Sequence, residues 1–172
     1  MAVKVVFSHG KESGPWGRKI TALAELAQAR GCEVESLDYR DLPEDAEARV
    51  ERLVEHLSGY DSLPVLVGSS MGGYVSTVAS TRHPVPGLFL MAPALYISPY
   101  AVQEYDSRAQ HIEVVHGWAD TVIPVELSMR FARHMNCTVH MVAGDHRLAS
   151  ALPEVSDLFD NFLDRVEARQ TQ

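Results

Sequence analysis

The chain has 172 residues, of which 46% are hydrophobic and 22% are charged, which is the composition of a globular protein with one core. Its 15 Lys and Arg residues are outnumbered by 23 Asp and Glu residues, so the formal net charge is -8 and binding to nucleic acid is disfavoured. No apolar run approaches the roughly 20 residues that span a bilayer, and the N-terminal run lacks the length and cleavage pattern of a signal peptide. We therefore expect one cytoplasmic domain over residues 1–172, with neither nucleic acid nor a membrane as a partner.

The two cysteines, Cys32 and Cys137, lie far apart and show no metal-ligand spacing. Two reduced, structural thiols in a cytoplasmic protein are the simplest interpretation. The sequence implies no cofactor and no metal, and it does not indicate the oligomeric state.

Apolar runs alternate with amphipathic segments along the first half of the chain. The compact runs, which suit parallel strands buried on both faces, are residues 3–7, 34–37 and 65–67. The segments for which we expect helices are residues 16–30, 46–57 and 71–81. Gly31 and Gly59 follow the first two of these segments and are typical of helix C-termini.

The same alternation continues to the end of the chain. Further strands are expected at residues 87–91, 112–115 and 138–142, and further helices at 125–134 and 155–166. Residues 92–110 connect two of these strands, and Ser98-Pro99 is typical of the N-cap and first position of a short crossover helix.

This alternation predicts an α/β fold, a three-layer αβα sandwich with about six mostly parallel strands. Right-handed crossovers place the carboxyl ends of the strands at one edge of the sheet, which is where such sheets hold their chemistry. The motifs that follow all come directly after an expected strand.

The strongest motif is Gly68-Ser69-Ser70-Met71-Gly72, a G-x-S-x-G between an expected strand and an expected helix. A serine hydroxyl is a poor nucleophile unless it is exposed, aimed and deprotonated by a neighbouring base. The sharp strand-to-helix turn exposes Ser70 above the sheet, and glycines at both ends let the two backbones approach. A turn that cradles phosphate is the alternative, but no Walker lysine follows it. We therefore expect Ser70 to be a nucleophile.

Candidates for the acid and the base follow the last two strands. Asp120 lies in His116-Gly117-Trp118-Ala119-Asp120, and His146 in Gly144-Asp145-His146, so the order Ser70, Asp120, His146 is that of a hydrolase triad. Asp120 alone is equally consistent with a turn or helix-capping residue before Pro124. Asp106 and Asp145 are its competitors, the second more consistent with a role in shaping its own loop.

The other seven histidines fit the role of base less well. His56, His83, His111 and His134 fall in helices or at the opposite edge of the sheet, His140 lies within a strand, and His9 and His116 are expected to brace strand-end loops. Only His146 combines a loop at the active edge with a position after the acid.

Acyl transfer also needs two donors aimed at the oxyanion of its transition state. The backbone N–H of Met71, directly after Ser70, is one candidate, and the N–H of Lys11, after His9-Gly10, is the second. A plain glycine turn is the alternative interpretation of residues 8–12. The aromatic candidates for the walls of a substrate pocket, some of which are equally consistent with the core, are Trp16, Tyr74, Tyr96, Tyr100 and Trp118.

Four segments, SHGKESGPWG, GSSMGG, HGWADTVIP and GDHRL, resemble the α/β-hydrolase superfamily. More narrowly, they resemble the small bacterial esterases of the YqiA type and the dienelactone-hydrolase and thioesterase branch. The resemblance covers residues 3–166 and implies a six-stranded core with ester or thioester hydrolysis. Ser70 stands where dienelactone hydrolases have a cysteine, which argues against that substrate.

The sequence thus predicts a serine hydrolase that cleaves small carboxylic esters through an acyl-enzyme, with a small ester or thioester as its partner. Acyl thioester or peptide hydrolysis by the same residues is the alternative within enzymes. A binding module with little turnover is the alternative outside them, because a fold does not fix a function. No cap domain fits within residues 92–110, so we expect a shallow, open site that prefers short acyl chains.

Overall fold

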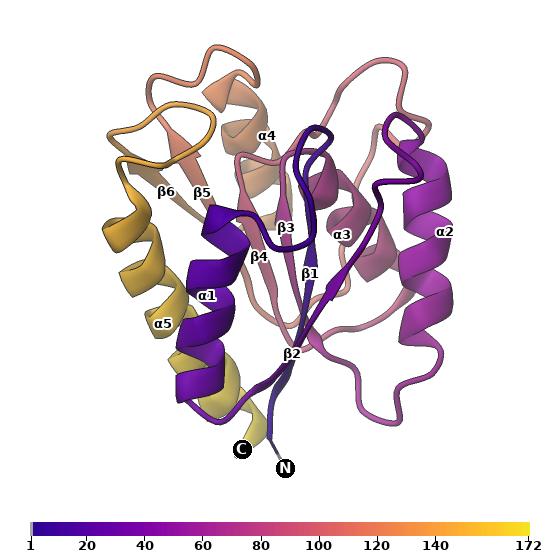
Figure 1. Ribbon diagram of the computed structural model, residues 1–172, viewed down its shortest axis with the longest axis vertical. Helices are drawn as coiled ribbons and strands as arrows, with labels where there is room; N and C mark the ends of the chain where they lie inside the picture. The colour runs from indigo at the N-terminus through magenta and orange to yellow at the C-terminus, as the bar shows by residue number, and fades with distance from the viewer. Residues whose placement is uncertain (1) are drawn as a thin grey trace.

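The computed structural model describes residues 2–172, which form one six-stranded sheet with helices on both faces (Figure 1). The strands are β1 (Lys4–Ser8), β2 (Glu33–Leu37), β3 (Val65–Ser69), β4 (Leu88–Met91), β5 (Ile112–Gly117) and β6 (Thr138–Val142). Their order across the sheet is β2-β1-β3-β4-β5-β6, and every neighbouring pair is parallel. The expected parallel sheet is confirmed.

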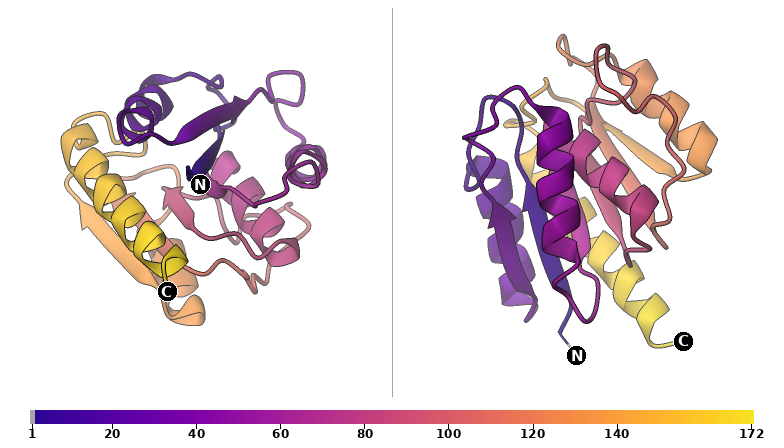
Figure 2. Two further views of the ribbon diagram at one scale, coloured as in Figure 1. Left: turned by 90° about the horizontal axis from the view of Figure 1, so that it is seen from below. Right: turned by 90° about the vertical axis from the view of Figure 1, so that its right-hand side faces the viewer.

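Five helices connect or follow these strands: α1 (Arg18–Ala29), α2 (Ala46–Leu57), α3 (Met71–Arg82), α4 (Val125–Met135) and α5 (Leu152–Gln170). Helices α1 and α5 cover one face of the sheet, and α2, α3 and α4 cover the other (Figures 1 and 2). This is the expected three-layer arrangement. The observed bounds differ from the predicted ones by a few residues, because runs of apolar residues locate elements better than they locate their ends.

The burial of each strand follows from its position in the sheet. All residues of the central strands β3, β4 and β5 are buried, which explains why they lack strict alternation of polar and apolar residues. The edge strands β2 and β6 are partly exposed and accordingly more polar.

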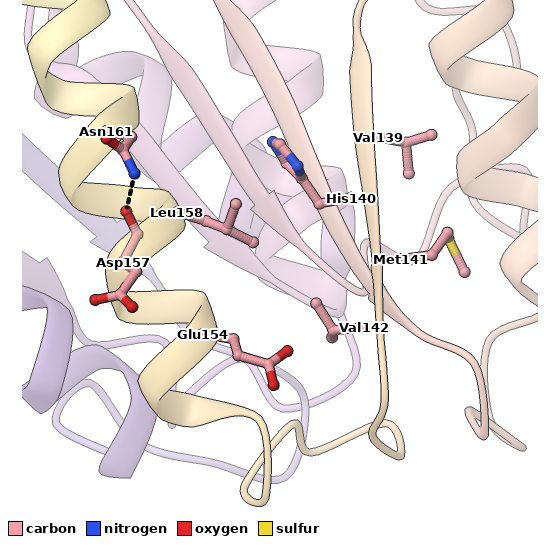
Figure 3. A pocket seen from close by; sticks show the side chains of 8 residues that line it. All are labelled: Val139, His140, Met141, Val142, Glu154, Asp157, Leu158 and Asn161. Carbon is pink, nitrogen blue, oxygen red and sulfur yellow. Dashed lines mark hydrogen bonds between the residues drawn. The ribbon is translucent and has the colours of Figure 1, made fainter.

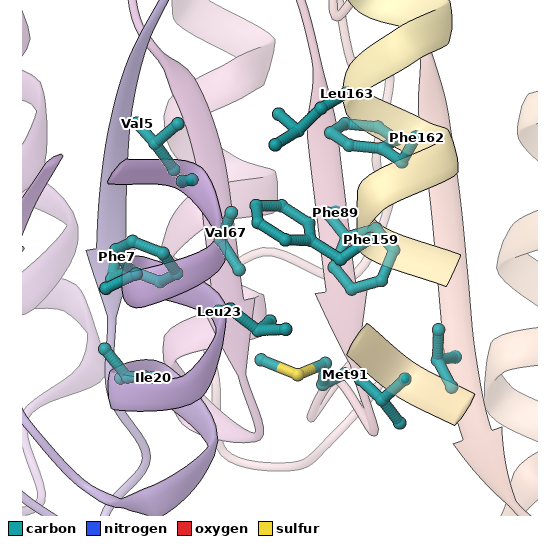
Figure 4. Packing of buried hydrophobic residues seen from close by; sticks show 14 of the residues in the cluster. Val5, Phe7, Ile20, Leu23, Val67, Phe89, Met91, Phe159, Phe162 and Leu163 are labelled. Carbon is teal, nitrogen blue, oxygen red and sulfur yellow. The ribbon is translucent and has the colours of Figure 1, made fainter. Parts of the chain in front are cut away.

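Each face of the sheet has its own apolar core. Under α1 and α5, Figure 4 shows Phe89 beneath Phe159 and Phe162 of α5, with ring centroids 5.1 and 5.2 Å from that of Phe89. Under α2, α3 and α4 the second core includes Tyr74 and Tyr105, neither of which has any exposed surface. Helix α3 is buried from Met71 to Ser80, so the segment that follows the G-x-S-x-G motif is held on all sides.

The crossover helix expected after Ser98 was a wrong prediction, because residues 92–111 contain no helix. Tyrosine hydroxyls bond the backbone of this segment instead. Tyr105 Oη donates to Val102 O (3.0 Å) and accepts from the Tyr96 amide (3.0 Å), while Tyr74 Oη accepts from the Val102 amide (3.1 Å). The segment is thus fixed to the core in irregular conformation and forms no cap over the sheet edge.

The loops after β1, β3, β5 and β6 gather at one edge of the sheet, and both termini lie at the opposite edge (Figure 1). This arrangement follows from the parallel strands and brings segments distant in sequence to one place. None of the helices in residues 2–172 has the length and apolar character needed to cross a membrane.

Candidate active site

Ser70 occupies the turn between β3 and α3 in a strained conformation. Its φ is 54° and its ψ is -118°, a combination rare for a residue with a side chain. The turn is held on both sides, since the Ser70 amide donates to Met91 O (3.1 Å) and its carbonyl accepts from the Ala94 amide (2.9 Å). The side chain is thereby fixed above the sheet edge.

The glycines of the motif are required by close packing of backbones. A Cβ atom on Gly68 would clash with the carbonyl of Gly72, and one on Gly72 would clash with the carbonyl of Ser8. Only hydrogen fits at these two positions, so α3 can pack directly against β1 and β3.

Ser70, His146 and Asp120 form a continuous chain of hydrogen bonds. Ser70 Oγ lies 3.1 Å from His146 Nε2, and His146 Nδ1 lies 2.8 Å from Asp120 Oδ2. Because Nδ1 faces a carboxylate, it carries the proton and donates it, which leaves Nε2 as the acceptor for the serine hydroxyl. Asp120 and His146 lie 50 and 76 positions after Ser70 in the sequence. In the fold the three side chains are arranged as an orienting acid, a base and a nucleophile.

The Asp120 side chain has no exposed surface and is fully hydrogen-bonded. Its Oδ1 accepts from the amides of Val122 and Ile123, each at 2.8 Å, and its Oδ2 accepts from His146. Burial on its own raises the pKa of Asp120, but the hydrogen bonds from His146 and the two amides outweigh it and keep the pKa below its ordinary value. Asp120 is therefore ionised at neutral pH and stabilises a protonated His146.

A second histidine, His116, also contacts Asp120, a contact that was not predicted from the sequence. His116 is completely buried, and its Nε2 donates to Asp120 Oδ2 (2.9 Å) and Ile123 O (3.0 Å). Ser128 Oγ lies 2.7 Å from Nδ1 and fixes the ring. His116 does brace its loop as expected. The missed signal was its spacing of four residues from Asp120 directly after a strand.

Both amides expected to stabilise an oxyanion are free to do so. Within residues 2–172, the N–H groups of Met71 and Lys11 donate to no other residue. Gly10 places the β1 loop against the nucleophile, since a Cβ on Gly10 would lie 3.4 Å from Ser70 Cβ. The two amides thus belong to two turns that meet at Ser70.

The β1 loop is held from behind by buried polar side chains. His9 Nδ1 donates to Gly10 O (2.8 Å) and its Nε2 accepts from the Tyr39 amide (2.9 Å). Arg49, which has no exposed surface, donates to His9 O (3.0 Å) and Gly10 O (3.2 Å). Burial lowers the pKa of His9, which matches the neutral form in these contacts. The carbonyls at this turn are bound away from the site.

A cavity of about 940 Å³ opens beside Ser70. It is lined by the β1 loop, the first turn of α1, the nucleophile turn, residues 94–100 and the loops after β5 and β6. Of the five aromatic side chains expected in its walls, Tyr100 lines it.

The structure corrects the expectation for the other four aromatic side chains. Tyr74 is enclosed in the core and bonded to Glu47, and Tyr96 packs between Tyr105 and Arg130. Trp16 and Trp118 are 54% and 63% exposed and lie outside the cavity wall. Aromatic character alone does not separate core, surface and pocket.

The competing acids are engaged elsewhere. Asp106 pairs with His134 (3.0 Å) on the surface. Asp145 accepts from the amides of Arg147 (3.0 Å) and Leu148 (3.2 Å), so it shapes the loop that presents His146, as expected. Among residues 2–172, no group of three or more His, Cys, Asp or Glu side chains is placed to hold a metal ion.

A second hollow, of about 540 Å³, lies between β6 and α5 (Figure 3). Its lining residues are Val139, His140, Met141, Val142, Glu154, Asp157, Leu158 and Asn161, with no serine, threonine or cysteine among them. His140 is bonded to Glu113 (2.6 Å), and Asn161 to the carbonyl of Asp157 (2.9 Å). This hollow therefore offers no nucleophile for acyl transfer.

Comparison with known proteins agrees with this site. A profile of the alpha/beta hydrolase family matches residues 5–170, so the chain belongs to that family. A proposed hydrolase of the alpha/beta superfamily from Xanthomonas campestris pv. campestris is 32% identical, over 95% of this chain and 99% of that one, with a TM-score of 0.87. Family and relative together support hydrolase activity. The curated proteins include no match to this chain.

More distant structures share the fold. The ydeN gene product from B. subtilis is 18% identical, over 95% of this chain and 100% of that chain, with a TM-score of 0.79. Est1E from Butyrivibrio proteoclasticus is 15% identical, over 97% of this chain and 89% of that chain, with a TM-score of 0.77. At these identities the likeness concerns the fold alone.

Proposed function

We propose that the protein is a serine hydrolase that cleaves small carboxylic esters through an acyl-enzyme intermediate. One observation carries the proposal: Asp120, His146 and Ser70 are linked by hydrogen bonds of 2.8 and 3.1 Å that end on a serine in a strained turn. Such a chain turns an alcohol into a nucleophile at neutral pH. The proposal adds the substrate class to the hydrolase activity that the family supports.

The reaction runs in two halves. In the first, the Ser70 proton passes to His146 Nε2 while Oγ bonds to the ester carbon, and the amides of Met71 and Lys11 bind the negative oxygen. The bond to the alcohol then breaks, and His146 gives its proton to the leaving oxygen. In the second half, water gives its proton to His146 and attacks the acyl group, and the return of that proton to Ser70 Oγ releases the acid.

Residues 92–111 form no cap, and only Ala94, Ile97 and Tyr100 of this segment line the cavity. Long acyl chains gain affinity when a deep apolar groove encloses them, at about 0.8 kcal/mol for each methylene. An uncapped site therefore favours acyl groups of roughly two to six carbons over long chains. Two free cysteines, Cys32 and Cys137, fit action in the cytoplasm.

The test is a substrate panel measured by pH-stat: phenyl esters from acetate to palmitate, matched acyl thioesters and anilides. We expect kcat/KM to be highest for short oxygen esters and to vanish in Ser70→Ala. A maximum for thioesters or anilides would reassign the substrate class within the same chemistry. Absence of turnover on every substrate would contradict the proposal and favour a binding module.

A further inference from the structure

The cavity beside Ser70 is rich in basic side chains although the chain as a whole is acidic. Four lining side chains are basic: Lys11, Arg18, Lys19 and Arg147. Two are acidic, Glu12 and Asp145, whereas the whole chain has 15 basic and 23 acidic residues. An acidic protein that gathers basic groups around its reactive serine attracts anions to that place.

Three of the four basic groups are not neutralised by the protein. Lys11 pairs with Glu44 at 3.1 Å and is satisfied. Arg18, Lys19 and the Arg147 side chain form no ion pair and no side-chain hydrogen bond with any other residue in 2–172. Elsewhere on the surface, arginines typically find partners, as Arg30 does with three carboxylates of α5.

Among residues 2–172, neither acid of the cavity lining, Glu12 or Asp145, forms an ion pair with these cations. Asp145 Oδ1 accepts the amides of Arg147 and Leu148, and its carboxylate forms no ion pair with a basic side chain among the described residues. The cations of the cavity therefore have room for an anion from outside.

Helix α1 begins at this cavity with positively charged residues, whereas a helix N-terminus favours negative charge. Its first two residues are Arg18 and Lys19, its N-cap Gly17 makes no side-chain bond, and its first turn has no acid. Helices α2, α4 and α5 each have an acid in the first turn, Glu47, Glu126 and Glu154, although α5 also begins at the cavity, with Leu152. Cations next to the positive end of a helix dipole repel it, and a bound anion relieves that repulsion.

Lys19 is the most enclosed of these cations. Burial lowers the pKa of Lys19, Arg147 lowers it further, and the charges of Asp145 and Asp120 act in the opposite direction. Lys19 and Arg147 line the same cavity. An anion that bridged Lys19 and Arg147 would lie in the cavity that Ser70 also lines.

Building on the ester hydrolysis proposed above, we propose that the natural substrate carries a carboxylate, which Lys19 and Arg147, with Arg18 at the rim, bind beside Ser70. The scissile ester is then presented to Ser70 by the anchored carboxylate. Neutral esters remain substrates but lack the anchor.

The test compares carboxylates with isosteric amides. For the acyl side the pair is the monophenyl ester of adipic acid and the phenyl ester of adipamic acid. For the alcohol side it is 4-acetoxyphenylacetate and 4-acetoxyphenylacetamide, in which a methylene separates the charge from the phenol. For wild type at low ionic strength, we expect kcat/KM to favour the carboxylate by about tenfold in at least one pair.

The ratio of kcat/KM for the carboxylate to kcat/KM for the amide should fall toward one in the double variant Lys19→Gln/Arg147→Gln. The matched control is Lys4→Gln/Arg82→Gln, which removes two charges at the opposite end of the sheet and should keep the ratio. Added salt should lower the ratio in wild type, because the cavity is open to solvent.

Three results would overturn the proposal in distinguishable ways. Carboxylates no better than amides in both pairs, with Ser70-dependent hydrolysis of the neutral esters, would overturn the anion site alone. A ratio unchanged in the Lys19→Gln/Arg147→Gln variant would overturn the assignment to these two residues. No hydrolysis of any ester would overturn the proposed function itself.

Discussion

Strand β5 has a buried carboxylate between two histidines near each of its ends, and the two groups do different things. At its start, Glu113 binds His111 (2.7 Å), His140 (2.6 Å) and Arg165 (2.6 Å). Just beyond its end, Asp120 binds His116 (2.9 Å) and His146 (2.8 Å). Both carboxylates are excluded from solvent, with side chains 1% and 0% exposed.

The histidines around Asp120 lead to a reactive group, whereas those around Glu113 do not. His146 is hydrogen-bonded in turn to Ser70 Oγ, and Ser70 lines a cavity. His111 and His140 end on Glu113, whose third partner is the half-exposed Arg165. A carboxylate with two histidines is therefore not a catalytic site by itself. The difference lies in the proposed nucleophile, Ser70, and the proposed oxyanion donors, which belong to the carboxyl edge of the sheet.

The largest expected effect is that of Ser70→Ala. Loss of a triad nucleophile reduces kcat by on the order of 10⁶, while the fold should persist, since the side chain is not part of the core. The matched control is Ser76→Ala in α3, which should retain activity within about threefold because Ser76 is buried, does not line the cavity and its Oγ has no hydrogen-bond partner in residues 2–172. Steady-state ester hydrolysis measures both; a Ser70→Ala variant with a tenth of wild-type activity would show that another residue attacks.

Asp120→Asn tests the comparison between the two carboxylates. An amide lets His146 adopt the tautomer that cannot accept the serine proton, so kcat should fall by about 10⁴ with Ser70 unmoved. Glu113→Gln makes the same chemical change at the other end of β5 and should leave kcat within about threefold. If Asp106→Asn or Asp145→Asn proved more damaging than Asp120→Asn, the acid would be wrongly assigned.

His116→Phe removes one donor to Asp120 and keeps a ring in the buried site. The loss of a hydrogen bond to a charged group, worth about 1.5–3 kcal/mol, predicts a 10- to 100-fold lower kcat with KM little changed. His116→Gln places an amide donor near the same point and should recover part of the loss. Equal losses of kcat in both variants, or a change in KM alone, would show that His116 does not position Asp120. The free energy of unfolding of each variant shows whether a loss of activity comes from a loss of the fold.

Glu113→Gln should lower the free energy of unfolding rather than the activity. Burial raises the pKa of Glu113, but its bonds to His140, His111 and Arg165 outweigh this and hold the pKa below its ordinary value. A carboxylate whose pKa is lowered by folding stabilises the protein above its unfolded pKa of about 4.3, and this contribution is lost as the pH falls through the folded pKa. The variant should therefore be less stable than wild type at pH 7, by about 1–3 kcal/mol, with a difference that shrinks below about pH 4. Urea unfolding at pH 7 and pH 3.5 measures this; an equal difference at both values would contradict it.

The alternation of apolar runs and amphipathic segments was enough to predict the sheet and its helices. The three proposed catalytic residues could be predicted because each lies within four residues of the end of a strand, and parallel topology brings strand ends together. The connection at residues 92–111 was not predictable in the same way. Its conformation depends on the hydroxyls of Tyr74 and Tyr105, which are contacts made in three dimensions.

The supporting contacts of the site were harder to foresee than its reactive groups. Arg49 lies in an amphipathic helix, where a charged residue is expected to face solvent, yet it is buried behind the β1 loop. The position of an aromatic residue in the sequence likewise did not reveal whether it would lie in the core, on the surface or at the cavity. Such roles depend on how helices rotate against the sheet.

The central claim is that Asp120 and His146 activate Ser70, and covalent labelling tests it most directly. Wild type and variants are treated with a fluorophosphonate, and the rate and site of modification are followed by mass spectrometry. We expect one adduct, on Ser70, that forms far more slowly in His146→Ala and Asp120→Asn and at the wild-type rate in Glu113→Gln. An adduct on another residue, or labelling of Ser70 that is indifferent to His146 and Asp120, would contradict it.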